Sequence, residues 1–124
     1  MTLPDTVCIV DDDEDMRKVL VHIVRSVGLA AESFDSAEAF LKRRPDVPVR
    51  CLLVDVELKG MSGVALLETL GEGERAFPVF LISGAHDALT TDSAKRRGAV
   101  VVDKPFDARS LGQRIRAAVR AAPH

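Results

Sequence analysis

Short apolar runs alternate along this chain with longer segments of helical periodicity. The runs are Val7–Val10, Ala30–Phe34, Cys51–Val54, Val79–Ile82 and Val100–Val102. Four of the five are continuously apolar and rich in Val, Ile and Leu, a pattern typical of parallel strands that helices cover on both faces. The run Ala30–Phe34 is more polar, which predicts an edge strand.

The segments between the runs predict five helices. Their expected N-terminal caps are Asp13, Asp35 or Ser36, Ser62 and Asp107. Apolar positions expected to face the core include Met16, Val19, Leu20, Ile23 and Val24 in the first helix, and Phe40 and Leu41 in the second. The fourth helix, about Asp87 to Arg97, has Leu89 as its one large apolar residue. We therefore expect this helix to be weakly anchored.

This alternation predicts an α/β fold, a single (βα)₅ doubly wound parallel sheet with strand order 2-1-3-4-5 and right-handed crossovers. A length of 124 residues fits one domain. We expect its core to span about residues 6–119, with 120–124 as a tail or the start of a linker. In such sheets, ligands bind beyond the carboxyl ends of the strands.

Polar groups stand at four of those strand ends. The first run leads into Asp11 and Asp12, the third into Asp55, the fourth into Ser83, and the fifth reaches Lys104 after one more residue. Taken alone, each has an ordinary explanation: a turn or helix cap for an aspartate, a loop hydroxyl for Ser83 and a surface charge for Lys104. Because the predicted strand order makes these four strands neighbours, we expect the groups to surround one pocket.

The chemistry of this pocket points to a metal ion and a phosphoryl group. Crowded carboxylates repel one another unless a cation lies between them. Hard oxygen donors that leave room for water suit Mg²⁺. A lysine and a hydroxyl beside the metal complement a phosphoryl group on a carboxylate, with an aspartate as the nucleophile.

Five motifs in order resemble the response-regulator receivers of two-component signalling. They are Ile-Val-Asp-Asp-Asp at 9–13, Leu-Val-Asp-Val-Glu at 53–57, Gly-Met-Ser-Gly at 60–63, Leu-Ile-Ser-Gly at 81–84 and Asp-Lys-Pro-Phe at 103–106. The resemblance covers nearly the whole chain, and the segments at 36–41 and 61–64 look most similar to the FixJ-type branch.

The resemblance implies a role for each candidate residue. Asp55 is the expected phosphoacceptor, taking the group from a sensor histidine kinase. Mg²⁺ is the expected cofactor, held by Asp11, Asp12, Asp55 and the backbone carbonyl of Glu57. Ser83 and Lys104 are expected to hold the phosphoryl group, and the Lys104–Pro105 bond is often cis in this family.

Three departures from the family pattern stand out. Val101 occupies the position, three before the active lysine, where an aromatic residue is usual, so the ordinary coupled movement of hydroxyl and ring is not expected. Ser83 replaces the commoner Thr. Lys59 replaces the usual Pro, which predicts a looser loop, and Glu57 is expected to tune the lifetime of the phosphoryl group.

Composition excludes several other classes of protein. The formal net charge of −2 gives no large basic field for nucleic acid, and no apolar run is long enough for a membrane helix. The N-terminus lacks the features of a signal peptide, so the expected location is the cytoplasm. Cys8 and Cys51 lie in apolar runs and are expected to be buried, reduced thiols.

The expected function is therefore a phosphoacceptor switch, without independent enzymatic turnover. Its expected output surface is formed by the fourth helix, fifth strand and fifth helix, and any dimer is expected to form through the same surface. The expected effector is a downstream protein or a missing C-terminal output domain. A phosphorylation-independent binding module is the alternative, and a phosphohydrolase or a flavodoxin-like FMN carrier is a more distant one.

Overall fold

The computed structural model describes residues 6–43, 48–70, 77–84 and 88–121, with only the backbone described for 88–91. The five strands are β1 (Thr6–Val10), β2 (Ala30–Phe34), β3 (Val49–Asp55), β4 (Val79–Ser83) and β5 (Val100–Asp103). The helices are α1 (Glu14–Ser26), α2 (Ala37–Leu41), α3 (Gly63–Leu70), α4 (Ala88–Arg96) and α5 (Ala108–Ala121).

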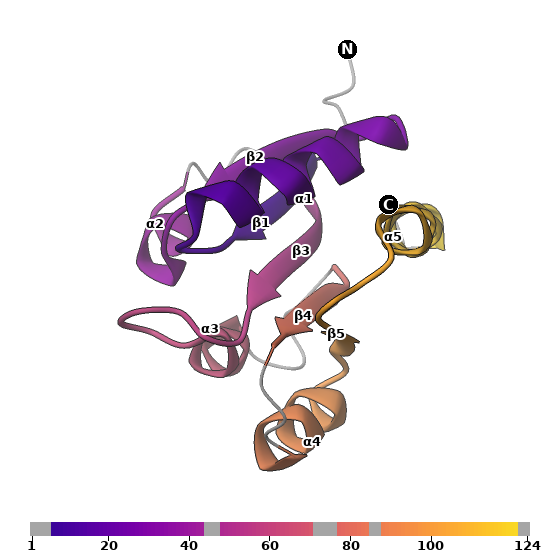
Figure 1. Cartoon of the computed structure of the whole chain (residues 1–124). Helices are drawn as coiled ribbons and strands as arrows, with labels where there is room; N and C mark the ends of the chain where they lie inside the picture. Colours follow the sequence, from indigo (N-terminus) through magenta and orange to yellow (C-terminus); the bar gives the residue numbers. More distant parts are fainter. Residues whose placement is uncertain (1–5, 44–47, 71–76, 85–87, 122–124) are drawn as a thin grey trace.

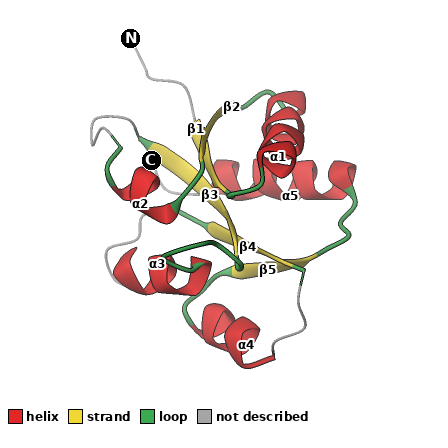
Figure 2. Ribbon diagram, turned by 60° about the vertical axis from the view of Figure 1, so that its left-hand side comes forward, coloured by secondary structure: helices red, strands yellow, loops and turns green. Residues whose placement is uncertain are grey.

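The strands form one parallel sheet in the order β2-β1-β3-β4-β5, as predicted. Helices α1 and α5 cover one face, and α2, α3 and α4 cover the other (Figures 1 and 2). Because successive strand residues point to opposite faces, neighbouring β1 residues enter different cores. Ile9 packs under α1 and α5, and Cys8 packs under the other three helices. The predicted fold class is confirmed.

Helix starts follow the expected local chemistry. The Asp13 side chain accepts the N–H groups of Asp15 and Met16 at 3.0 and 3.4 Å and caps α1. Of the two candidates for α2, Ser36 is the cap, since its Oγ accepts the N–H of Ala39 at 3.0 Å. Ser62 accepts the N–H of Ala65 and α5 begins directly after Asp107.

Two expected core positions are wrong. Val19 is 46% exposed and Leu41 is 37% exposed. Val19 lies on the outer side of α1, because Leu20, Ile23 and Val24 already fill the stripe that faces the sheet. In the short helix α2, Phe40 alone is fully buried among the larger side chains. The side chain of Leu89 lies outside the described residues.

A glycine inside α5 lets two helices approach closely. A Cβ placed on Gly112 would lie 3.1 Å from Val27 Cγ1 and 3.4 Å from Ile23 Cγ2, both near the end of α1. Periodicity did not indicate this residue, because glycine is normally unfavourable inside a helix. Close packing of α1 on α5 explains why it is there.

The two cysteines lie on opposite faces of the sheet and are free and buried, as predicted. Burial raises the pKa of the Cys8 thiol to about 11 and that of Cys51 to about 12. Among the described residues, no helix has both the length and the apolar character needed to cross a membrane.

Candidate functional site

Four strands bring polar residues to one edge of the sheet. The register pairs Val10 with Val54, Asp55 with Ile82, and Ser83 with Asp103. Strands β3 and β4 each run one residue further than the apolar pattern indicated, so Asp55 and Ser83 are the last residues of their strands. Their backbones are therefore held by the sheet.

Three carboxylates meet at this edge. Asp11, Asp12 and Asp55 each place one oxygen so that all three oxygens lie within 4.8 Å of one another. Asp11 is fully buried and Asp55 is 6% exposed, whereas Asp12 is half-buried. The sequence predicted this convergence from residues 44 positions apart, because parallel strands end together.

Lys104 completes the cluster from the end of β5. Its Nζ lies 3.3 Å from Asp55 Oδ2, and its peptide bond to Pro105 is cis. The Lys104 N–H donates to the backbone oxygen of Ser83 at 2.8 Å, and Ser83 is 3% exposed. Thus, the predicted lysine and aspartate are in contact, and Ser83 lies at the end of the strand between them.

The loop after β3 is tied to the cluster through its backbone. The Glu57 N–H donates to Asp55 Oδ1 at 2.9 Å, and the Lys59 N–H donates to Asp12 Oδ2 at 3.2 Å. A proline at position 59 has no N–H to donate. Lys59 therefore gives the cluster a backbone hydrogen bond that a proline could not give, and the looser loop stays a prediction.

A third carboxylate, that of Glu38 in α2, holds the same loop. The Met61 N–H donates to Glu38 Oε1 at 3.1 Å, and a Cβ on Gly60, which has φ +78°, would lie 3.3 Å from Glu38 Oε2. The sequence analysis did not identify Glu38 as part of the site. A hydrogen bond across 23 positions has no local signal in the sequence.

Arg17 supports the cluster from α1. Its Nη1 donates to the backbone oxygen of Asp11 at 2.8 Å. Sequence reasoning missed this residue, because an arginine on an exposed helical stripe is ordinarily a solvated charge.

The environment of Asp11 disfavours its ionised form. Burial is the main cause, and the pKa of this carboxyl group rises from 3.8 to about 6. The hydrogen bond from the Asp13 N–H and the positive charge on Lys104 lower the pKa, whereas the negative charges on Asp55 and Asp12 raise it. The Asp13 N–H bonds Asp11 Oδ1 at 2.9 Å, whereas the buried Oδ2 has no hydrogen-bond partner among the described residues. A buried carboxylate oxygen without a donor suits a cation or a cation-bound water.

We expect Asp11→Asn to raise the free energy of unfolding at about pH 7, without divalent cations, by about 1 to 2 kcal/mol. The folded-state pKa lies above the unfolded value, so the free energy of unfolding falls as the pH rises from about 4 to about 6 and stays lowered above that. Below about pH 4 both states are protonated and this effect disappears. An asparagine oxygen can still accept the Asp13 N–H.

Urea unfolding of both proteins in EDTA, at about pH 4 and about pH 7, measures this difference. A gain in stability that is the same at both pH values would contradict the electrostatic explanation. It would show instead that the amide packs better than the carboxyl group in either protonation state.

Comparison with known proteins identifies the family. The family described as the response regulator receiver domain matches residues 7–116. The chain belongs to this family.

Relatives of this receiver domain agree with the FixJ-type resemblance. Transcriptional regulatory protein FixJ of Rhizobium meliloti is 39% identical over 96% of the chain and 57% of its own length. FixJ of Bradyrhizobium diazoefficiens is 32% identical over 98% of the chain and 60% of its own length. The crystal structure of FixJ-N, 35% identical, matches with a TM-score of 0.85 and covers 99% of both chains. The receiver domain thus spans somewhat more than half the length of these curated relatives.

The family explains the acidic cluster in general terms. Receiver domains of two-component response regulators take part in phosphoacceptor signalling and bind Mg²⁺ at an acidic pocket. They belong to regulators and are not metabolic enzymes. The donor set at the end of this sheet, three carboxylates with one unpartnered buried oxygen, fits such an ion.

Val101, which replaces the aromatic residue usual in the family, lies in β5. Val101 is half-buried, pairs in register with Leu81 and packs in the core beneath α2, α3 and α4. This receiver domain therefore has no ring at that position to move when the site changes.

Proposed function

We propose that the chain is a Mg²⁺-dependent switch that receives a phosphoryl group on Asp55 from a phosphohistidine of a sensor histidine kinase. The observation that carries this proposal is the meeting of Asp55 with Asp11 and Asp12 within 4.8 Å and with Lys104 at 3.3 Å. A nucleophilic carboxylate, metal-binding oxygens and a phosphate-binding cation are the groups that such a transfer needs.

Four residues would hold the metal ion. Asp12 and Asp55 would bind it directly, Asp11 would bind through water, and Glu57 would contribute its backbone carbonyl. When bound, Mg²⁺ supplies positive charge that offsets the carboxylates and the incoming phosphoryl group. The bond between the Glu57 N–H and Asp55 Oδ1 supports this assignment, because it keeps the backbone of Glu57 beside the phosphoacceptor.

In the proposed transfer, a carboxylate oxygen of Asp55 forms a bond to phosphorus while the bond from phosphorus to the kinase histidine breaks. The ammonium group of Lys104 balances charge on the transferred group, and the Ser83 hydroxyl donates a hydrogen bond to it. The sheet orients Asp55 and Ser83 before the donor arrives, because both are terminal strand residues.

The transferred group adds a charge of about −1.5 to −2 next to Lys104 and Ser83. We propose that the response to this charge shifts the loops after β3 and β4 and changes the surface formed by α4, β5 and α5. With Val101 in β5, the shift is carried by the hydroxyl and lysine without an aromatic partner. That surface would bind a second copy, a downstream protein or an output domain. Hydrolysis at Asp55, with Glu57 affecting its rate, would reset the switch.

The test uses the whole chain with acetyl phosphate as donor. Intact mass spectrometry is expected to show the gain of one phosphoryl group in Mg²⁺ and no gain in EDTA. A gain that is insensitive to EDTA would contradict the metal-dependent mechanism. No gain, together with no binding of Mg²⁺ in calorimetry, would favour the phosphorylation-independent binding module.

A further inference from the structure

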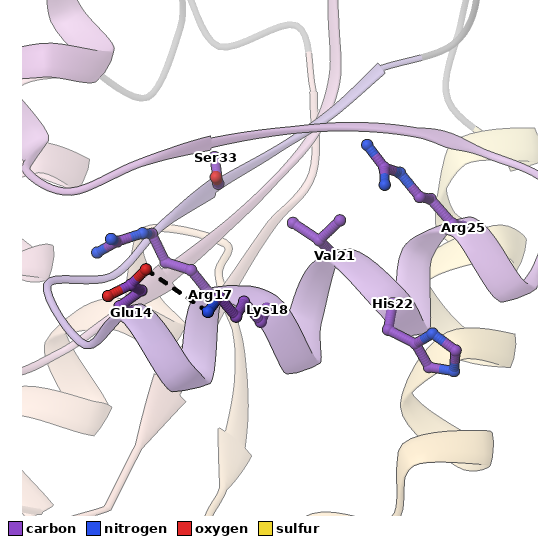
Figure 3. A pocket seen from close by; sticks show the side chains of 7 residues that line it. All are labelled: Glu14, Arg17, Lys18, Val21, His22, Arg25 and Ser33. Carbon is purple, nitrogen blue, oxygen red and sulfur yellow. Dashed lines mark ion pairs between the residues drawn. The ribbon is translucent and has the colours of Figure 1, made fainter.

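A basic groove lies between α1 and the outer strand β2. Its volume is about 430 Å³, and we call it the α1–β2 groove. Its lining residues are Glu14, Arg17, Lys18, Val21, His22, Arg25 and Ser33. Figure 3 shows Arg17, Val21 and Arg25 extending from the helix toward the strand that carries Ser33.

The charge of the groove is mainly positive. Arg17, Lys18 and Arg25 are cationic, and the one acidic lining residue, Glu14, lies 3.6 Å from Lys18 in an exposed pair. Arg25 has no ion-pair partner among the described residues, and its side chain is exposed. Exposed ion pairs contribute little, so the groove keeps positive charge available to an anionic ligand.

One wall of the groove is an open sheet edge. Strand β2 pairs with β1 alone among the described strands. The Asp11 N–H donates to the Phe34 oxygen at 3.1 Å, so Phe34 faces β1 through its backbone. Backbone groups alternate in direction along a parallel strand. The N–H and C=O groups of Ala31 and Ser33 therefore point to the open edge, where another strand can pair.

We propose that the α1–β2 groove binds an extended, acidic segment of a partner protein, which pairs with the open edge of β2. Arg17 and Arg25 are eight residues apart on α1, a separation of about 12 Å along the helix. An extended chain covers that distance in about four residues, with residues on the same face about 6.6 Å apart. Two acidic residues four positions apart, on the same face of the segment, can therefore reach Arg17 and Arg25, which lie about two helical turns apart.

The groove is also connected to the acidic cluster. Arg17 lines the groove and donates through Nη1 to the backbone oxygen of Asp11. A carboxylate of the bound segment that accepts the remaining N–H groups of Arg17 would contact the same side chain that bonds the Asp11 backbone oxygen at the end of β1. Arg17 would thus connect the bound segment to the acidic cluster.

The test measures fluorescence anisotropy of a fluorescein-labelled octapeptide in which Glu and Val alternate. The whole chain is expected to bind it, and Arg25→Glu is expected to weaken binding at least about tenfold, because a repulsive charge replaces an attractive one. Arg116→Glu is the matched control: it makes the same charge change at an exposed position of α5 and should leave binding nearly unchanged.

Three further peptides separate the proposed binding mode from simple charge attraction. A peptide of four Glu followed by four Val, a peptide with Lys in place of Glu, and an alternating peptide N-methylated on one edge should each bind at least about tenfold more weakly. Equal binding of the block peptide, equal binding of the methylated peptide, or equal loss in Arg25→Glu and Arg116→Glu would overturn the proposal. Acetyl phosphate labelling of Arg25→Glu should match the wild type, which confirms an intact fold.

Discussion

Asp55→Asn is expected to abolish labelling by acetyl phosphate in Mg²⁺. The amide lacks the negative oxygen that attacks phosphorus, and it removes one of the three carboxylates of the cluster. An asparagine still has an oxygen to accept the Glu57 N–H, so the loop after β3 should stay in place. Intact mass spectrometry should show no phosphorylated species, whereas circular dichroism should match that of the wild type.

Asp35→Asn is the matched control for this experiment. Asp35 also comes directly after a strand, β2, at the same edge of the sheet, but it is exposed and lies outside the acidic cluster. Its substitution should leave labelling unchanged. Persistent labelling of Asp55→Asn would show that another residue is the acceptor, and tryptic mapping would identify it.

Gly63→Ala is expected to lower the free energy of unfolding by about 3 kcal/mol. A Cβ on Gly63 would clash with the backbone oxygen of Asp55 and would lie 3.1 Å from Leu81 Cδ1. Neither neighbour can yield easily, because Asp55 is paired in the sheet and Leu81 is fully buried. Urea unfolding measures the loss, and labelling should also slow, because the backbone that must move carries the phosphoacceptor.

Gly84→Ala provides the comparison for Gly63→Ala. The added Cβ would lie 3.3 Å from Lys104 Cδ, part of a flexible side chain, at an exposed position. Its cost should be less than about 1 kcal/mol. Equal losses for the two variants would show that loss of glycine freedom, rather than the contact with Asp55, determines stability here.

The sequence predicted the sheet and the cluster because their causes are local or topological. Apolar runs such as Val79–Ile82 identify buried strands, and parallel order then brings Asp55 and Lys104 to one edge. Exact strand ends were not predictable, because pairing of Asp55 with Ile82 in β4 extends β3 by one residue beyond its apolar run. The exposure of Val19 depends on which stripe of α1 meets the sheet, and that depends on tertiary packing.

The hydrophobic pattern of the sequence could not predict contacts between residues that lie far apart in the chain. The Lys59 N–H reaches Asp12 across 47 positions, and Gly63 is needed because of the backbone oxygen of Asp55. Such contacts depend on backbone positions that exist only after folding. They explain why the hydrogen bond from the Lys59 N–H to Asp12 was not predicted.

The loop after β3 is held by amide hydrogens at alternating positions, those of Glu57, Lys59 and Met61. Nineteen of the twenty genetically encoded amino acids provide this hydrogen, and only proline lacks it. Side chains at these positions can therefore diverge during evolution while the loop keeps its shape. A low percentage identity in this segment therefore overstates how far its structure has diverged. A substitution to or from proline changes the hydrogen bonds of the loop more than a substitution that changes side-chain charge.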